Sequence, residues 1–269
     1  MRAAAAPLAT PITRARSVRV ASGTRQVPGQ QGPGQIVCFG GPSLNHANAA
    51  LNAYVLSLTP RKRPRVCFLV AEPSQAGDHV SAFYRHFPSS CCRPTHLFSF
   101  LRDTARRDLR NQLLRQDVIY VGGGRLVSLM NRWRLHGVDE ILRDAWENGT
   151  VLCGFRAGAL CWFAEAVTCF DGRVRAVRGL GLLPWSGCVH YRDGWARRSA
   201  YQSYVSRGML PGFGIEEGVA LRFVGTRLNE AVTAGPHARA FRLEAPHGGL
   251  KETPLASRDL TSAPRLSRC

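Results

Sequence analysis

The sequence predicts an α/β fold, with a doubly wound, mainly parallel sheet and helices on both faces. Several short runs are rich in β-branched and aromatic residues and are apolar at nearly every position, which is typical of parallel strands buried on both faces. Segments with helical periodicity alternate with these runs. Repeated strand, helix, strand units favour a parallel sheet that is covered on both sides.

Five segments carry the strand pattern. They are QIVCFGG at 35–41, RVCFLVA at 65–71, THLFSF at 95–100, DVIYVGGG at 117–124 and VLCGF at 151–155. Between the last two lies VDEILRDAWENG, at 138–149, whose apolar residues recur every three or four positions and give a helix one apolar face. Gly149 supplies the C-terminal stop of this helix.

The two ends of the chain differ in composition from the middle. Residues 1–34 hold five arginines and no acidic residue, which predicts a disordered basic extension. Residues 35–244 carry the strand and helix patterns and are predicted to form the α/β domain. Residues 245–269 show no regular pattern and are predicted to be a flexible C-terminal tail.

The formal net charge of +18 favours an anionic partner. No basic run alternates with aromatic residues, as it does in proteins that stack single-stranded bases, so nucleic acid is the less favoured partner. No stretch reaches the run of roughly 18 apolar residues that a membrane span needs, so no membrane partner is expected.

The nine cysteines include no C-x-x-C pair, so the sequence predicts neither a metal site nor a cofactor. An odd number of cysteines without a secretion signal predicts reduced thiols and a cytoplasmic protein.

Two glycine-rich loops follow predicted strands, VGGGR at 121–125 and GFRAG at 154–158. Sites in such sheets form outside the carboxyl ends of the strands, so we expect the two loops to meet at one crevice. The first loop lacks the spacing of a dinucleotide-binding motif and instead offers bare backbone N–H groups.

In the second loop, Gly154 and Gly158 flank Arg156 as glycines flank the apex of a nucleophile elbow. A guanidinium stays protonated and has no lone pair with which to attack a carbonyl.

The segment DVIYVGGGRLVSLMNRWRLHGVDEILRDAWENGTVLCGFRAGALCWF, with GLGLLPWSGCVHY and IEEGVALRFVG further along, resembles the peptidase E family of serine peptidases. The similarity runs from about residue 35 to 244. The resemblance implies the class I glutamine amidotransferase-like fold, a flavodoxin-like sandwich. It also implies a serine-type exopeptidase that hydrolyses Asp-X dipeptides.

The resemblance implies a role for each matching residue. Arg156 occupies the position of the serine nucleophile, His190 that of the general base, and Glu217 that of the acid that orients the base, with Asp171 as the alternative acid. The backbone N–H groups of Gly124 and Ala157 would form the oxyanion hole.

Three arginines depart from the family pattern. Arg156 replaces the serine, Arg125 replaces the asparagine after the glycines, and Arg192 follows the HY dipeptide where relatives often carry an acid. Without a nucleophile no acyl-enzyme forms, so catalysis is expected to be impaired.

Several interpretations of these residues stay open. Arg156 is interpreted as the result of drift or of a sequencing error, or as one half of an internal ion pair with Glu217. In a third interpretation it belongs to a binding site in which Arg125, Arg156 and Arg192 hold an acidic peptide or another small anion. His190 could equally be a structural histidine and Glu217 a solvated turn residue.

Overall fold

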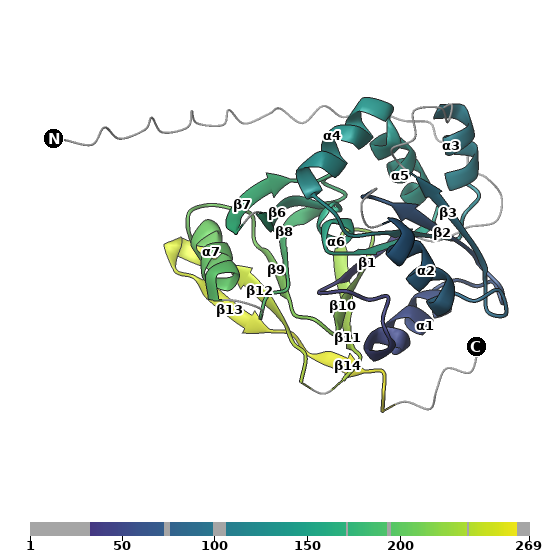
Figure 1. The fold of residues 1–269 in the computed structure, drawn as a ribbon. Helices are drawn as coiled ribbons and strands as arrows, with labels where there is room; N and C mark the ends of the chain where they lie inside the picture. The colour runs from purple at the N-terminus through teal and green to yellow at the C-terminus, as the bar shows by residue number, and fades with distance from the viewer. Residues whose placement is uncertain are drawn as a thin grey trace.

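The computed structural model describes residues 33–72, 76–98, 106–170, 172–192, 195–235 and 237–262. Two sheets form the framework, and the larger has eight strands in the order β14-β11-β10-β1-β5-β4-β2-β3 (Figure 1). Its parallel part consists of β1 (Gln35–Phe39), β5 (Val151–Phe155), β4 (Val118–Val121), β2 (Arg65–Val70) and β3 (Arg93–Phe98). All five predicted strands therefore form. Beyond β1 the sheet continues through β10 (Val219–Val224), β11 (Arg227–Thr233) and β14 (Ser257–Asp259).

Helices cover both faces of this sheet, as the sequence predicts. One face packs against α1 (Ala49–Ser57) and α2 (Ala76–His86). The other face packs against α3 (Arg106–Leu113), α4 (Leu126–His136) and α5 (Val138–Glu147). The predicted helix is α5, and Gly149 ends it with a φ of 87° while the Thr150 N–H donates to the Ala145 carbonyl at 3.0 Å.

A second sheet, which the strand pattern did not reveal, has the order β13-β12-β9-β8-β6-β7. Its strands are β6 (Phe163–Phe170), β7 (Arg173–Arg178), β8 (Leu183–Val189), β9 (Gly212–Ile215), β12 (Ala240–Glu244) and β13 (Lys251–Pro254). Its inner face joins the same apolar core as α4, α5 and the short helix α6 (Ala157–Leu160). The helix α7 (Trp195–Ser206) packs on its outer face.

Two features of the chain differ from expectation. The strand β3 is half-exposed rather than buried, because it ends the sheet and pairs only with β2. Within the segment predicted as a flexible tail over 245–269, the described residues form a 3-10 turn (Pro246–Gly248) followed by β13 and β14. Backbone pairing with β12 and β11 holds these two strands, and such pairing leaves no apolar periodicity in the sequence. The predicted basic extension lies outside the described residues except for 33 and 34.

Seven cysteines are free thiols, and all of them except Cys169 are buried. Cys91 is disulfide-bonded, so the expectation of uniformly reduced thiols is not met at that position.

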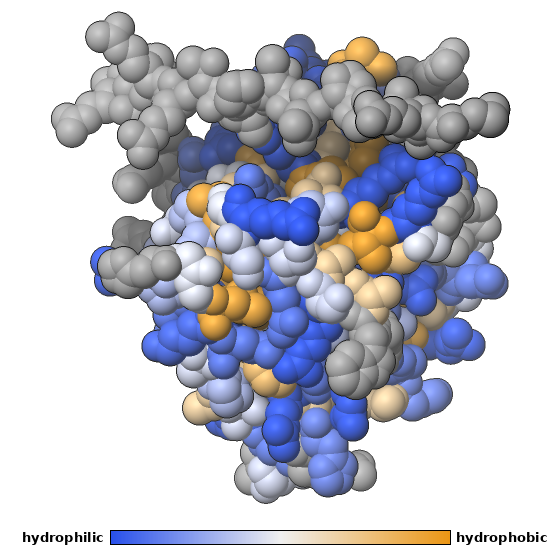
Figure 2. Space-filling model, turned by 90° about the vertical axis from the view of Figure 1, so that its left-hand side faces the viewer, coloured by the Kyte–Doolittle hydropathy of each residue, from blue (hydrophilic) through white to orange (hydrophobic). Residues whose placement is uncertain are grey.

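No helix in the described part of the chain has both the length and the apolar character to cross a membrane. Seen from the side of β7, α7 and β13, the visible surface is mostly hydrophilic with separate hydrophobic patches (Figure 2).

Candidate active site

The loop between β5 and α6 has the geometry of a nucleophile elbow. Arg156 lies at its apex with a φ of 54° and a ψ of −120°. A Cβ atom on Gly158 would lie 2.2 Å from the Val121 carbonyl oxygen, and one on Gly154 would lie 2.4 Å from the Gly158 carbonyl oxygen. The two flanking glycines are therefore required by close backbone approach, as the sequence predicts.

Arg156 and His190 are the two residues other than glycine with positive φ in the part of the chain that the structure describes. Such a conformation costs a residue with a side chain on the order of 1–3 kcal/mol and is concentrated at functional sites. His190, with a φ of 53°, follows the last residue of β8. The fold thus holds in strained backbone conformations the two residues to which the family resemblance assigns the nucleophile and base positions.

His190 is hydrogen-bonded to Glu217. Its Nδ1 lies 2.6 Å from the Glu217 Oε1 atom, and its backbone N–H donates to the Gly40 carbonyl at 2.7 Å. The Glu217 side chain crosses over Gly41, where a Cβ atom would lie 2.5 Å from the Glu217 Cγ atom. Glu217 therefore contacts the base rather than solvent alone.

The neighbouring Glu216 has a different part in the structure. Its side chain is buried and accepts the Arg239 backbone N–H at 2.9 Å, which ties the turn after β9 to the segment before β12. The two adjacent glutamates are thus distinguished by the fold, with Glu216 structural and Glu217 facing His190.

Burial lowers the pKa of His190 below its ordinary value of 6.5, and the charges of Arg197 and Arg156 lower this pKa further, while Glu217 raises it. At neutral pH the imidazole is therefore mainly uncharged, and its Nδ1–H donates to the Glu217 carboxylate. A neutral imidazole held by a carboxylate is the form that accepts a proton from a nucleophile.

The structure adds His79, on α2, to this region. Its ring meets the Phe155 ring edge-on at 5.4 Å between centroids, and both burial and the charge of Arg156 lower its pKa. No motif in the sequence indicates His79, because it lies within an ordinary amphipathic helix far along the chain from the elbow.

Replacing Arg156 with alanine should raise the pKa values of both His190 and His79, because the Arg156 charge lowers both. The pKa of His86 is lowered by burial, His46 and Arg85, so it should not change and serves as an internal control. The measurement is a pH titration of the imidazole C–H resonances by NMR. Unchanged titration of His190 and His79 in the variant would contradict the placement of Arg156.

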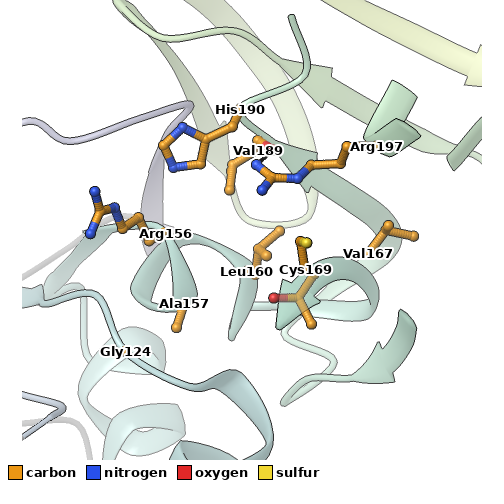
Figure 3. Close-up of a pocket in the computed structure, with 10 residues that line it drawn as sticks. Gly124, Arg156, Ala157, Leu160, Val167, Cys169, Val189, His190 and Arg197 are labelled. Carbon is orange, nitrogen blue, oxygen red and sulfur yellow. Dashed lines mark hydrogen bonds between the residues drawn. The ribbon is translucent and has the colours of Figure 1, made fainter. Parts of the chain in front are cut away.

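Two cavities adjoin the elbow. The first, of about 330 Å³, is lined by Gly124, Arg156, Ala157, Leu160, Val167, Thr168, Cys169, Val189, His190 and Arg197. Figure 3 shows the His190 ring on the Arg156 side of this cavity and the Arg197 guanidinium reaching toward Val189. Gly124 and Ala157, to which the family resemblance assigns the oxyanion hole, thus line the same cavity as His190.

The second cavity, of about 440 Å³, is lined by Glu72, Gly124, Arg125, Ser128, Arg132, Arg156 and Phe170. Arg125 begins α4 and places its guanidinium carbon 4.1 Å from the centre of the Phe170 ring. Arg156 is the arginine common to the two cavities, and no acidic residue among those described forms an ion pair with it. An internal Arg156–Glu217 pair is therefore not present.

Arg192, one of the predicted site residues, is exposed and lines neither cavity. Its expected place is taken by Arg197 of α7, which donates to the Val189 carbonyl at 3.2 Å. Asp171 lies outside the described residues, so its assignment as alternative acid stays a prediction. No three His, Cys, Asp or Glu side chains lie together as a metal site would require, over the described ranges.

Residues 36–231 match the family model of peptidase family S51. The chain belongs to peptidase family S51. A curated relative, the uncharacterized peptidase YgaJ of Bacillus subtilis (strain 168), is 37% identical over 224 residues, which cover 82% of this chain and 96% of the relative. The resemblance to the peptidase E family is thereby confirmed.

Solved structures agree with the family S51 assignment at the level of the fold. A peptidase from an acI-B1 Actinobacterium superposes with a TM-score of 0.67 at 16% identity, covering 84% of this chain and 95% of that protein. A Listeria monocytogenes EGD-e protein, provisionally assigned to peptidase E, superposes with a TM-score of 0.56 at 15% identity, and the match covers 73% of this chain and 97% of that protein. The predicted class I glutamine amidotransferase-like fold is confirmed.

Proposed function

We propose that this family S51 protein forms no serine acyl-enzyme and binds a small acidic ligand in the crevice beside the elbow. The observation that carries the proposal is Arg156, a permanent cation at the elbow apex that has no ion pair with an acidic residue in the described parts of the chain. Its guanidinium is suited to carboxylate or phosphate oxygens.

Loss of acyl transfer follows from the chemistry of the apex residue. His190 and Glu217 keep the contact of a base with its orienting acid, but the apex has no hydroxyl whose proton the base could take. Cys153 and Cys161 do not replace it, because both are fully buried and burial raises their pKa values. Cys169 lines the first cavity but comes from β6 rather than from the elbow.

Binding of an anion follows from the local charges. Arg156 and Arg197 both line the first cavity, and Glu217 is in contact with His190 rather than with either arginine. An acidic ligand would relieve the repulsion between the two guanidinium groups and accept their N–H donors. The expected ligands are a small acidic peptide or a small anion that carries carboxylate or phosphate.

Replacing Arg156 with alanine is expected to weaken the binding of an Asp-X dipeptide or of sulfate by about tenfold or more, because a hydrogen bond to a charged group contributes roughly 1.5–3 kcal/mol. Isothermal titration calorimetry measures the affinity, and chromatography shows whether the dipeptide stays intact. The matched control is Arg227→Ala, which removes one exposed charge beyond β10, at the opposite end of the sheet from the elbow. Equal affinities of the wild-type protein and the Arg156→Ala variant would disprove the proposal.

A further inference from the structure

We infer that the two cavities form one bipartite site, and that its ligand carries two separate anionic groups, one on each side of Arg156. The inference rests on the proposed function and adds the class of ligand. Each cavity contains arginine in addition to Arg156, so each offers its own charged donors.

In the first cavity the second cation is Arg197. One of its terminal nitrogen atoms donates to the Val189 carbonyl, which fixes the guanidinium at the wall. Its Nε atom is buried and has no acceptor among the described residues. This wall also includes His190 and the backbone of Gly124 and Ala157. Oxygen atoms of one anionic group fit the N–H donors of Arg156, Arg197 and the backbone, whereas the Nδ1–H of His190 is already donated to Glu217.

In the second cavity the additional cations are Arg125 and Arg132. Arg132 is held by a 2.7 Å hydrogen bond to the Ala71 carbonyl. The Arg125 guanidinium stacks on the Phe170 ring, which leaves the in-plane N–H groups at its edge as donors. Ser128 adds a hydroxyl, and Glu72 is the one acidic residue among the described residues of the lining. Arg125 and Arg156 both offer N–H donors to a ligand in this cavity.

The two cavities are separate compartments that meet at the elbow. Among the described residues, their linings share Gly124 and Arg156. Val167, Thr168 and Cys169 line the first cavity, whereas Phe170, the last residue of β6, lines the second. Because Arg125 is stacked on Phe170, it donates in the second compartment. A ligand that satisfies both sets of donors must therefore extend past Arg156.

The test uses linear dicarboxylates from malonate to adipate, each compared with the monocarboxylate of equal chain length, by isothermal titration calorimetry. The wild-type protein is expected to bind the best-fitting dicarboxylate about tenfold or more tightly than its monocarboxylate. Arg125→Gln and Arg197→Gln should each lower this ratio severalfold, because each variant removes one guanidinium donor from one of the two compartments. Arg227→Gln should leave the ratio unchanged.

Each other outcome has a definite meaning. Equal binding of dicarboxylates and monocarboxylates by the wild-type protein would overturn the bipartite site and leave the proposed function standing. A ratio that falls in only one of the two glutamine variants would place both anionic groups in a single compartment and would also overturn it. Absence of binding in both classes of probe would overturn the proposed function as well.

Discussion

Replacing Arg156 with serine should give the protein measurable hydrolytic activity toward Asp-X dipeptides, whereas the unmodified protein should form no serine acyl-enzyme. The elbow already has the required backbone, with a φ of 54° at its apex. The Nδ1 of His190 lies 2.6 Å from Glu217, and Gly124 and Ala157 line the same cavity. A hydroxyl at residue 156 would therefore meet a base and backbone donors that are already in place. Release of the amino acid product and labelling by a serine-reactive phosphonate measure the gain.

The controls separate the new hydroxyl from other effects. Arg156→Ala removes the cation without adding a nucleophile and should stay inactive. Adding His190→Gln to Arg156→Ser should lower the rate by roughly 10²–10⁴, the usual contribution of a general base. Cys169→Ser in the Arg156→Ser background should keep the activity, because the thiol belongs to β6.

Two results would contradict this expectation. One is stoichiometric labelling of a residue in the crevice of the unmodified protein by the phosphonate. The other is a lack of hydrolysis by both Arg156→Ser and Arg156→Ser/Arg125→Asn when both variants are folded. The second result would mean that the pocket has diverged beyond its nucleophile.

Replacing Gly158 with alanine should strongly destabilise the protein. The new Cβ atom would lie 2.2 Å from the Val121 carbonyl oxygen and 2.7 Å from that of Gly122, and both are backbone atoms that cannot rotate away. We expect a loss of about 3 kcal/mol in the free energy of unfolding, at the upper end of the usual cost of overpacking. Chemical denaturation followed by circular dichroism measures this change.

Gly77 provides the matched control, because it lies within α2 and a Cβ atom there would meet no atom of the described residues within 4 Å. Gly77→Ala should stabilise the protein by up to about 1 kcal/mol through the higher helix propensity of alanine. Similar stabilities for the two alanine variants would show that the backbone at the elbow yields more easily than its geometry indicates.

The sequence predicts the part of the fold that local pattern determines. The parallel strands are continuous apolar runs, and the elbow is visible because only glycine fits at 154 and 158. The second sheet was missed because strands such as β7 are short and polar on one side and become strands only through long-range pairing. The His190–Glu217 contact followed from family resemblance rather than from spacing, since 27 positions separate the two residues.

Local sequence pattern also predicts only some of the arginine and histidine residues around the elbow. Arg156 was identified by its motif, but Arg197 and His79 reach the region from α7 and α2. Arg192 was singled out because it follows the HY dipeptide, where relatives often carry an acid, yet it is exposed. Proximity along the chain does not indicate which side chain enters a cavity when a helix intervenes.

The C-terminal strands have a mechanical consequence for the site. Only Leu255 and Ala256 separate β13, at the edge of the smaller sheet, from β14, at the edge of the larger one. The turn from β9 to β10 also joins the two sheets, and it carries Glu217. Arg156 follows β5 of the larger sheet, and His190 follows β8 of the smaller sheet. The two short connections between the sheets, from β13 to β14 and from β9 to β10, therefore resist hinge motion between these two residues. A ligand bound as proposed would meet a crevice whose width is set before it arrives, and from that rigidity we expect discrimination between ligands by length.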